Sequence, residues 1–219
     1  MRREDITLDQ VRKAFEYMNY AFFTTGDYNL NIFGIRSKDL QADTFNDYIC
    51  LVYRKDGNMQ LKVYAATTDP GSTYRKRCID SRGTAIMLPG QYRGAYGIGL
   101  HRNSYEALRQ KKPMKYWRDK NCNGILDLGG DVFEEIAYTN IHRATNVKGG
   151  VSKLVQGHSA GCQVLASYND FEELMSIVRK AKDKYGNSFT YTLFTEDNFM
   201  CRNKDLKKYG VCGRSILIS

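Results

Sequence analysis

The sequence lacks the features that mark several large classes of protein. It has only three prolines, no Ser/Gly-rich stretch and no internal repeat, so nothing in its 219 residues indicates a linker or a repeat architecture. None of its six cysteines belongs to a Cys-x-x-Cys pair, which argues against a zinc site. No apolar run is long enough to cross a membrane, and none follows the charged start of the chain. We therefore expect no membrane span, no signal peptide, synthesis in the cytoplasm and free thiols.

The charge balance is basic. Thirty-three Lys and Arg stand against 24 Asp and Glu, a formal net charge of +9. This balance suits an anionic partner such as a cell-wall polymer, although solubility alone would also account for it. The basic residues are spread along the chain rather than clustered, so nucleic acid is not the favoured partner.

Aromatic content and hydrophobic alternation predict a mostly β or α+β fold. Sixteen Tyr and ten Phe favour strands, and a capping-box pattern at Thr7 opens an N-terminal helix within residues 1–27. We expect a main domain over 28–195 and a basic segment over 196–219 packed on it. The Gly-x-Gly at Gly97 is not followed by a helical pattern, which disfavours a dinucleotide fold. The predicted strands are 28–35, 48–53, 59–66, 84–88, 96–101, 136–141, 189–194 and 216–219, with helices at 104–111 and from 169.

One cysteine and one histidine stand out as candidate chemistry. Cys162 follows a flexible turn, Ser159-Ala160-Gly161, and His142 lies 20 positions upstream at the end of a predicted strand. A thiol attacks as thiolate, and a nearby imidazole can take its proton. The alternative is a buried structural cysteine. His101, after a Gly-rich run, is favoured as a structural histidine.

These motifs resemble the L,D-transpeptidase catalytic domain of the YkuD type. That family carries a strand ending in Ile-His-Gly and, after a loop, Ser/Thr-His-Gly-Cys; here the matches are Ile141-His142-Arg143 and Ser159-Ala160-Gly161-Cys162. The turn Thr68-Asp69-Pro70-Gly71 is similar to the family's Thr-Pro-x-Gly. The resemblance covers residues 28–195 and implies a β-sandwich-like sheet with one helix after the cysteine.

The resemblance also implies catalytic roles. Cys162 would be the nucleophile that forms an acyl-enzyme with a peptidoglycan stem peptide, and His142 would be its general base. Ser159 would orient His142 or the turn. The backbone amides of Gly161 and Cys162 would face the oxyanion, and one such donor contributes about 3 kcal/mol.

Two departures from the family pattern affect substrate binding. Ala160 stands where the family usually has histidine, with His158 two residues earlier. The arginine of the family's Cys-x-Arg is absent, because Gln163-Val164 follow Cys162. Arg143 is the candidate replacement for recognising a carboxylate, and His158 and Gln163 complete the expected substrate-binding set. Transpeptidation and hydrolysis both stay open.

A polar loop resembles a calcium-binding loop. Oxygen-bearing side chains stand at its first, third, fifth and ninth positions, and Gly124 at its sixth. The twelfth position is Gly130 instead of glutamate, and an ion-free Asn-Gly turn is the alternative. The four candidate ligands are Asp119, Asn121, Asn123 and Asp127. No other cofactor is expected.

The sequence thus predicts a cysteine enzyme of peptidoglycan that acts at the cell wall, or is carried in a virion if it is phage-encoded. The rival predictions are a catalytically inactive wall-binding or virion protein on the same fold, and a basic nucleic-acid-binding protein.

Overall fold

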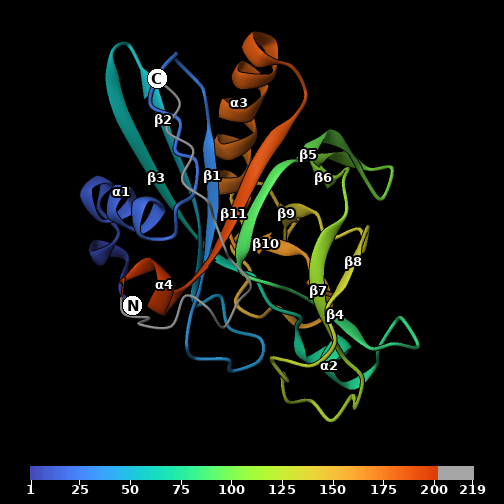
Figure 1. The fold of residues 1–219 in the computed structure, drawn as a ribbon. Helices are drawn as coiled ribbons and strands as arrows, with labels where there is room; N and C mark the ends of the chain where they lie inside the picture. Colours follow the sequence, from blue (N-terminus) through green and yellow to red (C-terminus); the bar gives the residue numbers. More distant parts are fainter. Residues whose placement is uncertain (202–219) are drawn as a thin grey trace.

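The computed structural model describes residues 1–201, and their largest sheet closes into a β-barrel (Figure 1). Its strand order is β1-β11-β5-β6-β9-β10-β3-β2, with parallel pairing only for β1 with β11 and for β9 with β10. The predicted β-rich class is confirmed, but the sheet closes into a barrel and is not specifically a sandwich. The barrel strands are Asn31–Arg36 (β1), Asp47–Lys55 (β2), Asn58–Thr67 (β3), Gly90–His101 (β5), Tyr105–Gln110 (β6), Ile141–Arg143 (β9), Gln163–Leu165 (β10) and Phe189–Thr195 (β11).

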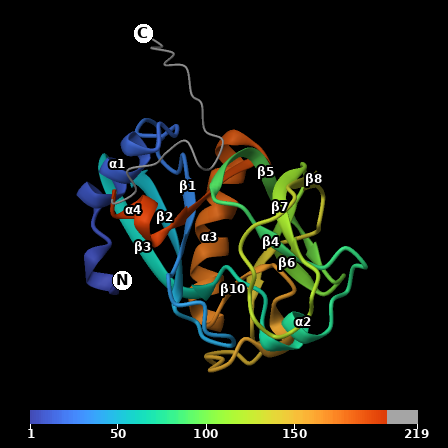
Figure 2. The same ribbon diagram turned by 60° about the horizontal axis from the view of Figure 1, so that its bottom comes forward.

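The long helix α3, Tyr168–Tyr185, packs into the main core. It lies between β1–β3 on one side and β5–β6 on the other (Figures 1 and 2). Ser167 caps its start, because its hydroxyl accepts the backbone N–H of Asp170 at 3.2 Å. Phe171, Leu174 and Val178, at helical spacing, are buried in the same cluster as strand residues of the barrel. The helix therefore closes over the inner face of the barrel beside β9 and β10.

A second apolar cluster covers the outer face of the barrel. Helix α1, Leu8–Tyr17, buries Phe15 against Phe33 of β1 and Phe194 of β11, with ring centroids 5.6 and 5.1 Å apart. The short helix α4, Glu196–Phe199, joins this cluster. None of the described helices has both the length and the hydrophobicity needed to span a bilayer.

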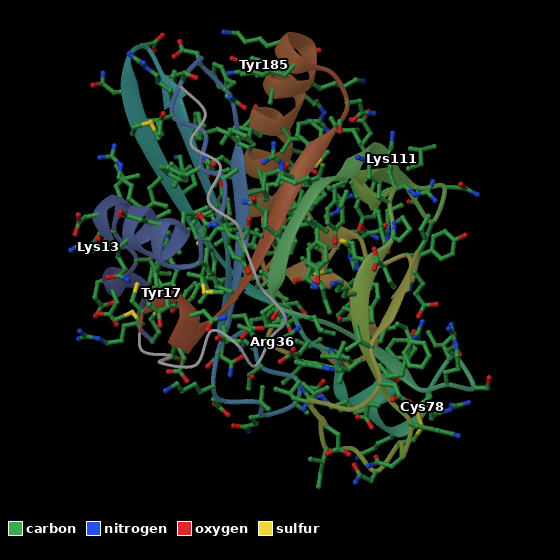
Figure 3. The ribbon with its side chains drawn as sticks, viewed as in Figure 1. Lys13, Tyr17, Arg36, Cys78, Lys111 and Tyr185 are labelled. Atoms are coloured by element: carbon green, nitrogen blue, oxygen red, sulfur yellow. A yellow bond between two sulfur atoms is a disulfide. The ribbon has the colours of Figure 1, made fainter. Side chains whose placement is uncertain are left out.

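A small sheet and a disulfide form the end of the molecule opposite the tip of α3. Strands β4 (Thr84–Met87), β7 (Met114–Asp119) and β8 (Phe133–Glu135) make this sheet, beside the short helix α2, Ser72–Lys76. Cys78, labelled in Figure 3, is bonded to Cys122 in the loop after β7. The expectation of free thiols is therefore wrong for these two cysteines, because the fold brings together positions 44 residues apart. Cys50, Cys162 and Cys201 are free, and Cys212 lies outside the described residues.

The structure confirms some of the predicted elements and corrects others. The hairpin between β2 and β3 turns at Asp56 and Gly57, both with positive φ, as the Asp-Gly pair predicts. The helix predicted at 104–111 is wrong, since this segment is β6, paired with β5 through a turn at Arg102 and Asn103. The strand predicted at 136–141 starts only at Ile141, and the one at 216–219 lies outside the described residues.

Candidate functional site

Strand pairing brings the candidate nucleophile and base together. β9 and β10 run parallel, with His142 opposite Val164 and Ile141 opposite Gln163. Extending this register by one residue sets Cys162 opposite Asn140, whose carbonyl accepts the N–H of Gln163 at 2.9 Å. Alternate residues share a face of a sheet, so Cys162 and His142 lie on one face with Cα atoms about 8 Å apart. The register thus places the two residues on the same face of this strand pair.

The hydrogen bond of His142 fixes its tautomer. Nδ1 lies 2.9 Å from the carbonyl oxygen of Arg143. A carbonyl oxygen only accepts, so Nδ1 carries the proton and Nε2 of the neutral ring keeps its lone pair. His142 therefore presents an acceptor nitrogen away from its own backbone, as a general base requires.

A second histidine holds the ring of His142 in place. The imidazole of His101 stacks on it, with centroids 4.2 Å apart and an interplanar angle of 22°. Asn140 orients His101: its Oδ1 accepts the N–H of Gln110 at 3.1 Å, so its Nδ2 donates to Nδ1 of His101 at 3.2 Å. His101 is thus a positioning residue beside the site, and only its Gly-rich surroundings in the sequence pointed to it.

The electrostatics keep both candidate groups neutral at rest. Burial, together with the nearby charges of His101 and Arg102, lowers the pKa of His142 to about 3. Burial raises the pKa of the Cys162 thiol to about 11, although Arg102 opposes this shift. At neutral pH the pair is therefore thiol and imidazole, not thiolate and imidazolium.

Ser159 organises the turn that carries Cys162. Its hydroxyl donates to the carbonyl of Cys162 at 2.8 Å and accepts the N–H of Gly161 at 3.2 Å. Gly161 has φ +113°, and a Cβ there would lie 2.4 Å from the carbonyl oxygen of Ala85. The backbone amide of Gly161 therefore already has an acceptor. Of the two predicted oxyanion donors, the amide of Cys162 is the one without a hydrogen-bond partner within residues 1–201.

A buried cluster of charged residues supports the turn that carries Cys162, through residues 68–71. Arg36, labelled in Figure 3, is 2% exposed and pairs with Asp69 at 2.7 Å. Asp47 accepts the N–H and the hydroxyl of Thr68 at 2.7 and 2.8 Å. These bonds fix the turn of residues 68–71, and the N–H of Gly71 then donates to the carbonyl of Ser159 at 2.9 Å. The turn that resembles the family's Thr-Pro-x-Gly therefore contacts the cysteine turn directly.

Two predicted substrate-binding residues already have partners within the protein. Gln163 is fully buried, and its Oε1 accepts the hydroxyl of Tyr191 at 2.8 Å. Arg143 pairs with Glu172 at 2.6 Å, and its guanidinium lies 3.9 Å from the ring centroid of Tyr105. The Gln163 bond joins β10 to β11, and the Arg143 pair joins β9 to α3, although Arg143 also lines the smaller of the two clefts described below.

One cleft lies beside the turn that precedes Cys162, and a second is lined by His142. The larger, about 370 Å³, is lined by Tyr138, Ala160, Arg82 and Glu135 among others, and Sγ of Cys162 lies 3.8 Å from the carbonyl oxygen of Tyr138. The smaller, about 240 Å³, is lined by His142 and His158 and by Arg102 at the tip of the β5–β6 hairpin.

Arg102 is a cation that the sequence analysis missed. It is exposed, and within residues 1–201 its guanidinium forms no ion pair or hydrogen bond. Only its place beside His101 in the hairpin turn could have indicated it. It is therefore the basic side chain of the smaller cleft that is free to meet an anion.

The predicted calcium loop lies at the far end of the small sheet. Asp119 ends β7, while Asn121, Asn123 and Asp127 are exposed in the loop that follows. The described part of the chain contains no group of three or more His, Cys, Asp or Glu side chains arranged to hold a metal. Any cation site here would depend on amide as well as carboxylate oxygens.

Comparison with protein-family models, with curated proteins and with solved structures finds no match to this chain.

Proposed function

We propose that this protein is a cysteine enzyme of the L,D-transpeptidase type that acts on amide bonds of peptidoglycan stem peptides. The observation that carries the proposal is the position of His142 on β9 and of Cys162 directly before the parallel strand β10, with Nδ1 of His142 bonded to the Arg143 carbonyl. That bond leaves Nε2 of the imidazole with its lone pair, as the atom that would take a thiol proton.

The proposed reaction starts from the neutral pair. As Sγ of Cys162 attacks the amide carbonyl, Nε2 of His142 takes the thiol proton, and the backbone N–H of Cys162 donates to the developing oxyanion. Collapse of the tetrahedral intermediate breaks the C–N bond, and His142 returns the proton to the leaving amine. The resulting thioester then reacts with an amine, giving a new cross-link, or with water, giving hydrolysis.

Arg102 fits the substrate's carboxylate better than Arg143 does. Arg143 is bonded to Glu172 and stacked on aromatic rings, whereas Arg102 is free at the smaller cleft. A guanidinium pairs with a carboxylate in a bidentate geometry. Arg102→Ala should therefore raise KM more than it lowers kcat, and Arg109→Ala on the same hairpin is the matched control.

Two properties support action outside the cytoplasm. Disulfides persist in oxidising surroundings, and Cys78–Cys122 is such a bond. The net charge of +9 favours retention near anionic wall polymers. A wall location, or transport in a virion, is consistent with both.

A catalytically inactive wall-binding module is the second candidate. It is favoured by the shifts in pKa, which leave little thiolate on Cys162 and a weakly basic His142. It is also favoured by the amide of Gly161, which already donates to Ser159. Such a protein would bind peptidoglycan without changing it.

Digestion of purified peptidoglycan distinguishes these candidates. Wild type, Cys162→Ala and the control Cys201→Ala, which removes a different free thiol, are incubated with sacculi, and the muropeptides are identified by mass. The enzyme proposal expects released D-alanine, a new cross-link or a cut bridge with wild type and Cys201→Ala only. Unchanged muropeptides with bound wild-type protein would support the inactive module instead.

A further inference from the structure

Asp119 presents a buried carboxylate that the protein leaves without a partner. The residue is 3% exposed, and neither carboxylate oxygen has a hydrogen-bond partner among residues 1–201. Burying a charged group without a partner is costly, so such a group indicates a missing ligand or an ion. Asp119 is not used by the proposed reaction.

The carboxylate of Asp119 faces the loop that follows it. Burial and the charge of Asp127 raise the pKa of Asp119, while the nearby backbone amides of Asp127 and Asn121 oppose this shift. Two basic residues of α2 lie nearby: Arg75, which is bonded to the carbonyls of Pro70 and Leu40, and Lys76, which packs over Gly124. Neither forms an ion pair with Asp119 or Asp127 in the described structure.

The loop offers further oxygen donors at the spacing that calcium loops use. Side-chain oxygens at positions 1, 3, 5 and 9 come from Asp119, Asn121, Asn123 and Asp127, and a backbone carbonyl at position 7 comes from Ile125. Gly124, at the sixth position, has φ +91°, which permits the sharp turn. Asn121 already contacts the carboxylate of Asp127 through its amide, so these two groups converge.

We propose that this loop binds one Ca²⁺ through Asp119, Asn121, Asn123, Asp127 and the carbonyl of Ile125. The ion would compensate the buried charge of Asp119 and the like charge of Asp127 at once. Calcium accepts an irregular shell of carboxylate and amide oxygens, whereas magnesium requires a near-ideal octahedron. With two carboxylates and no glutamate at the twelfth position, the dissociation constant should fall at about 10⁻⁴–10⁻³ M.

Bound calcium would also order one wall of the larger cleft. The loop joins β7 to β8, and Cys122 within it is bonded to Cys78, next to Ile79 and Asp80 of that wall. Glu135, at the end of β8, lines the same cleft. The site would therefore hold the loop against α2 whether or not Cys162 is catalytic.

Terbium luminescence tests the proposal locally. Tb³⁺ replaces Ca²⁺ at oxygen sites, and the single tryptophan, Trp117, stands two residues before Asp119 and can sensitise its emission. When Tb³⁺ is added to wild-type protein stripped of metal, we expect sensitised Tb³⁺ emission. Millimolar Ca²⁺ should displace the Tb³⁺ and reduce this emission, whereas the same concentration of Mg²⁺ should not. Asp119→Asn and the exposed variant Asp127→Asn should each weaken binding by about tenfold or more, because half of the ligand charge is lost.

The matched control is Asp183→Asn, which removes the same charge near the end of α3. That end, marked by Tyr185, lies far from Cys78 in Figure 3. Asp183→Asn should bind as wild type does. Absence of sensitised emission, emission that Ca²⁺ does not displace, or equal affinity in Asp127→Asn and Asp183→Asn would each overturn the proposal. Because Asp127 is exposed, its variant keeps the test decisive even if Asp119→Asn fails to fold.

Discussion

The reactivity of Cys162 as a function of pH gives the sharpest test of the neutral pair. Burial raises the pKa of this thiol from 9.0 to about 11. At pH 7 the thiolate fraction is then about one in ten thousand, roughly a hundredfold below that of an ordinary thiol of pKa 9.0. The pKa of His142, lowered to about 3, removes the imidazolium that would otherwise stabilise a thiolate.

The assay is alkylation by iodoacetamide, followed by peptide mass mapping of Cys162 between pH 6 and pH 10. Because the reagent attacks the thiolate, the rate should rise about tenfold per pH unit throughout this range, with no plateau. Catalysis uses the neutral pair, so kcat/KM should stay flat over about pH 5–9, between the two shifted pKa values. An alkylation rate that levels off below pH 8 would mean a preformed thiolate–imidazolium pair and would refute the reasoning.

Three further predictions concern the elements that hold the site. His142→Ala should lower kcat/KM by about 10²–10⁴, since the general base is lost; a loss below tenfold would exclude that role. Gly161→Ala should abolish activity and lower the melting temperature, because its Cβ would meet a carbonyl at 2.4 Å. The control Gly149→Ala also has positive φ but open space around it, and should keep full activity. Cys78→Ala should lower the free energy of unfolding by up to about 4 kcal/mol, the chain-entropy value for a 44-residue separation. Urea titration measures this free energy. If dithiothreitol left the stability of the wild-type protein unchanged, that result would contradict the bond between Cys78 and Cys122.

Local signals in the sequence predicted much of the strand framework. The Asp56-Gly57 pair predicts the hairpin between β2 and β3, and the capping pattern at Asn169 predicts a helix, which the structure starts one residue earlier at Tyr168. Glu106, Ala107 and Leu108 favour helices in isolation, so the local sequence predicts a helix where the structure has strand β6. In the folded chain, pairing with β5 overrides that preference.

The candidate site likewise has a part that the sequence indicates and a part that depends on distant elements of the fold. The motifs around His142 and Cys162 single out two residues, and the parallel register of β9 and β10 places them on the same face of that strand pair. The engagement of Arg143 with Glu172 and the stack of His101 on His142 depend on α3 and on the β5–β6 hairpin, which lie far away in the sequence. No local pattern carries such contacts, and the Cys78–Cys122 bond was missed for the same reason.

Trapping the acyl-enzyme tests the central claim most directly. The protein is mixed with a purified stem tetrapeptide, quenched in acid at short times, digested and analysed by mass spectrometry. The account predicts a transient thioester on the peptide that contains Cys162, with the mass of the acyl fragment, formed far more slowly in His142→Ala. A wild-type protein that converts the tetrapeptide while Cys162 stays unmodified, or a Cys162→Ala variant of equal activity, would contradict it.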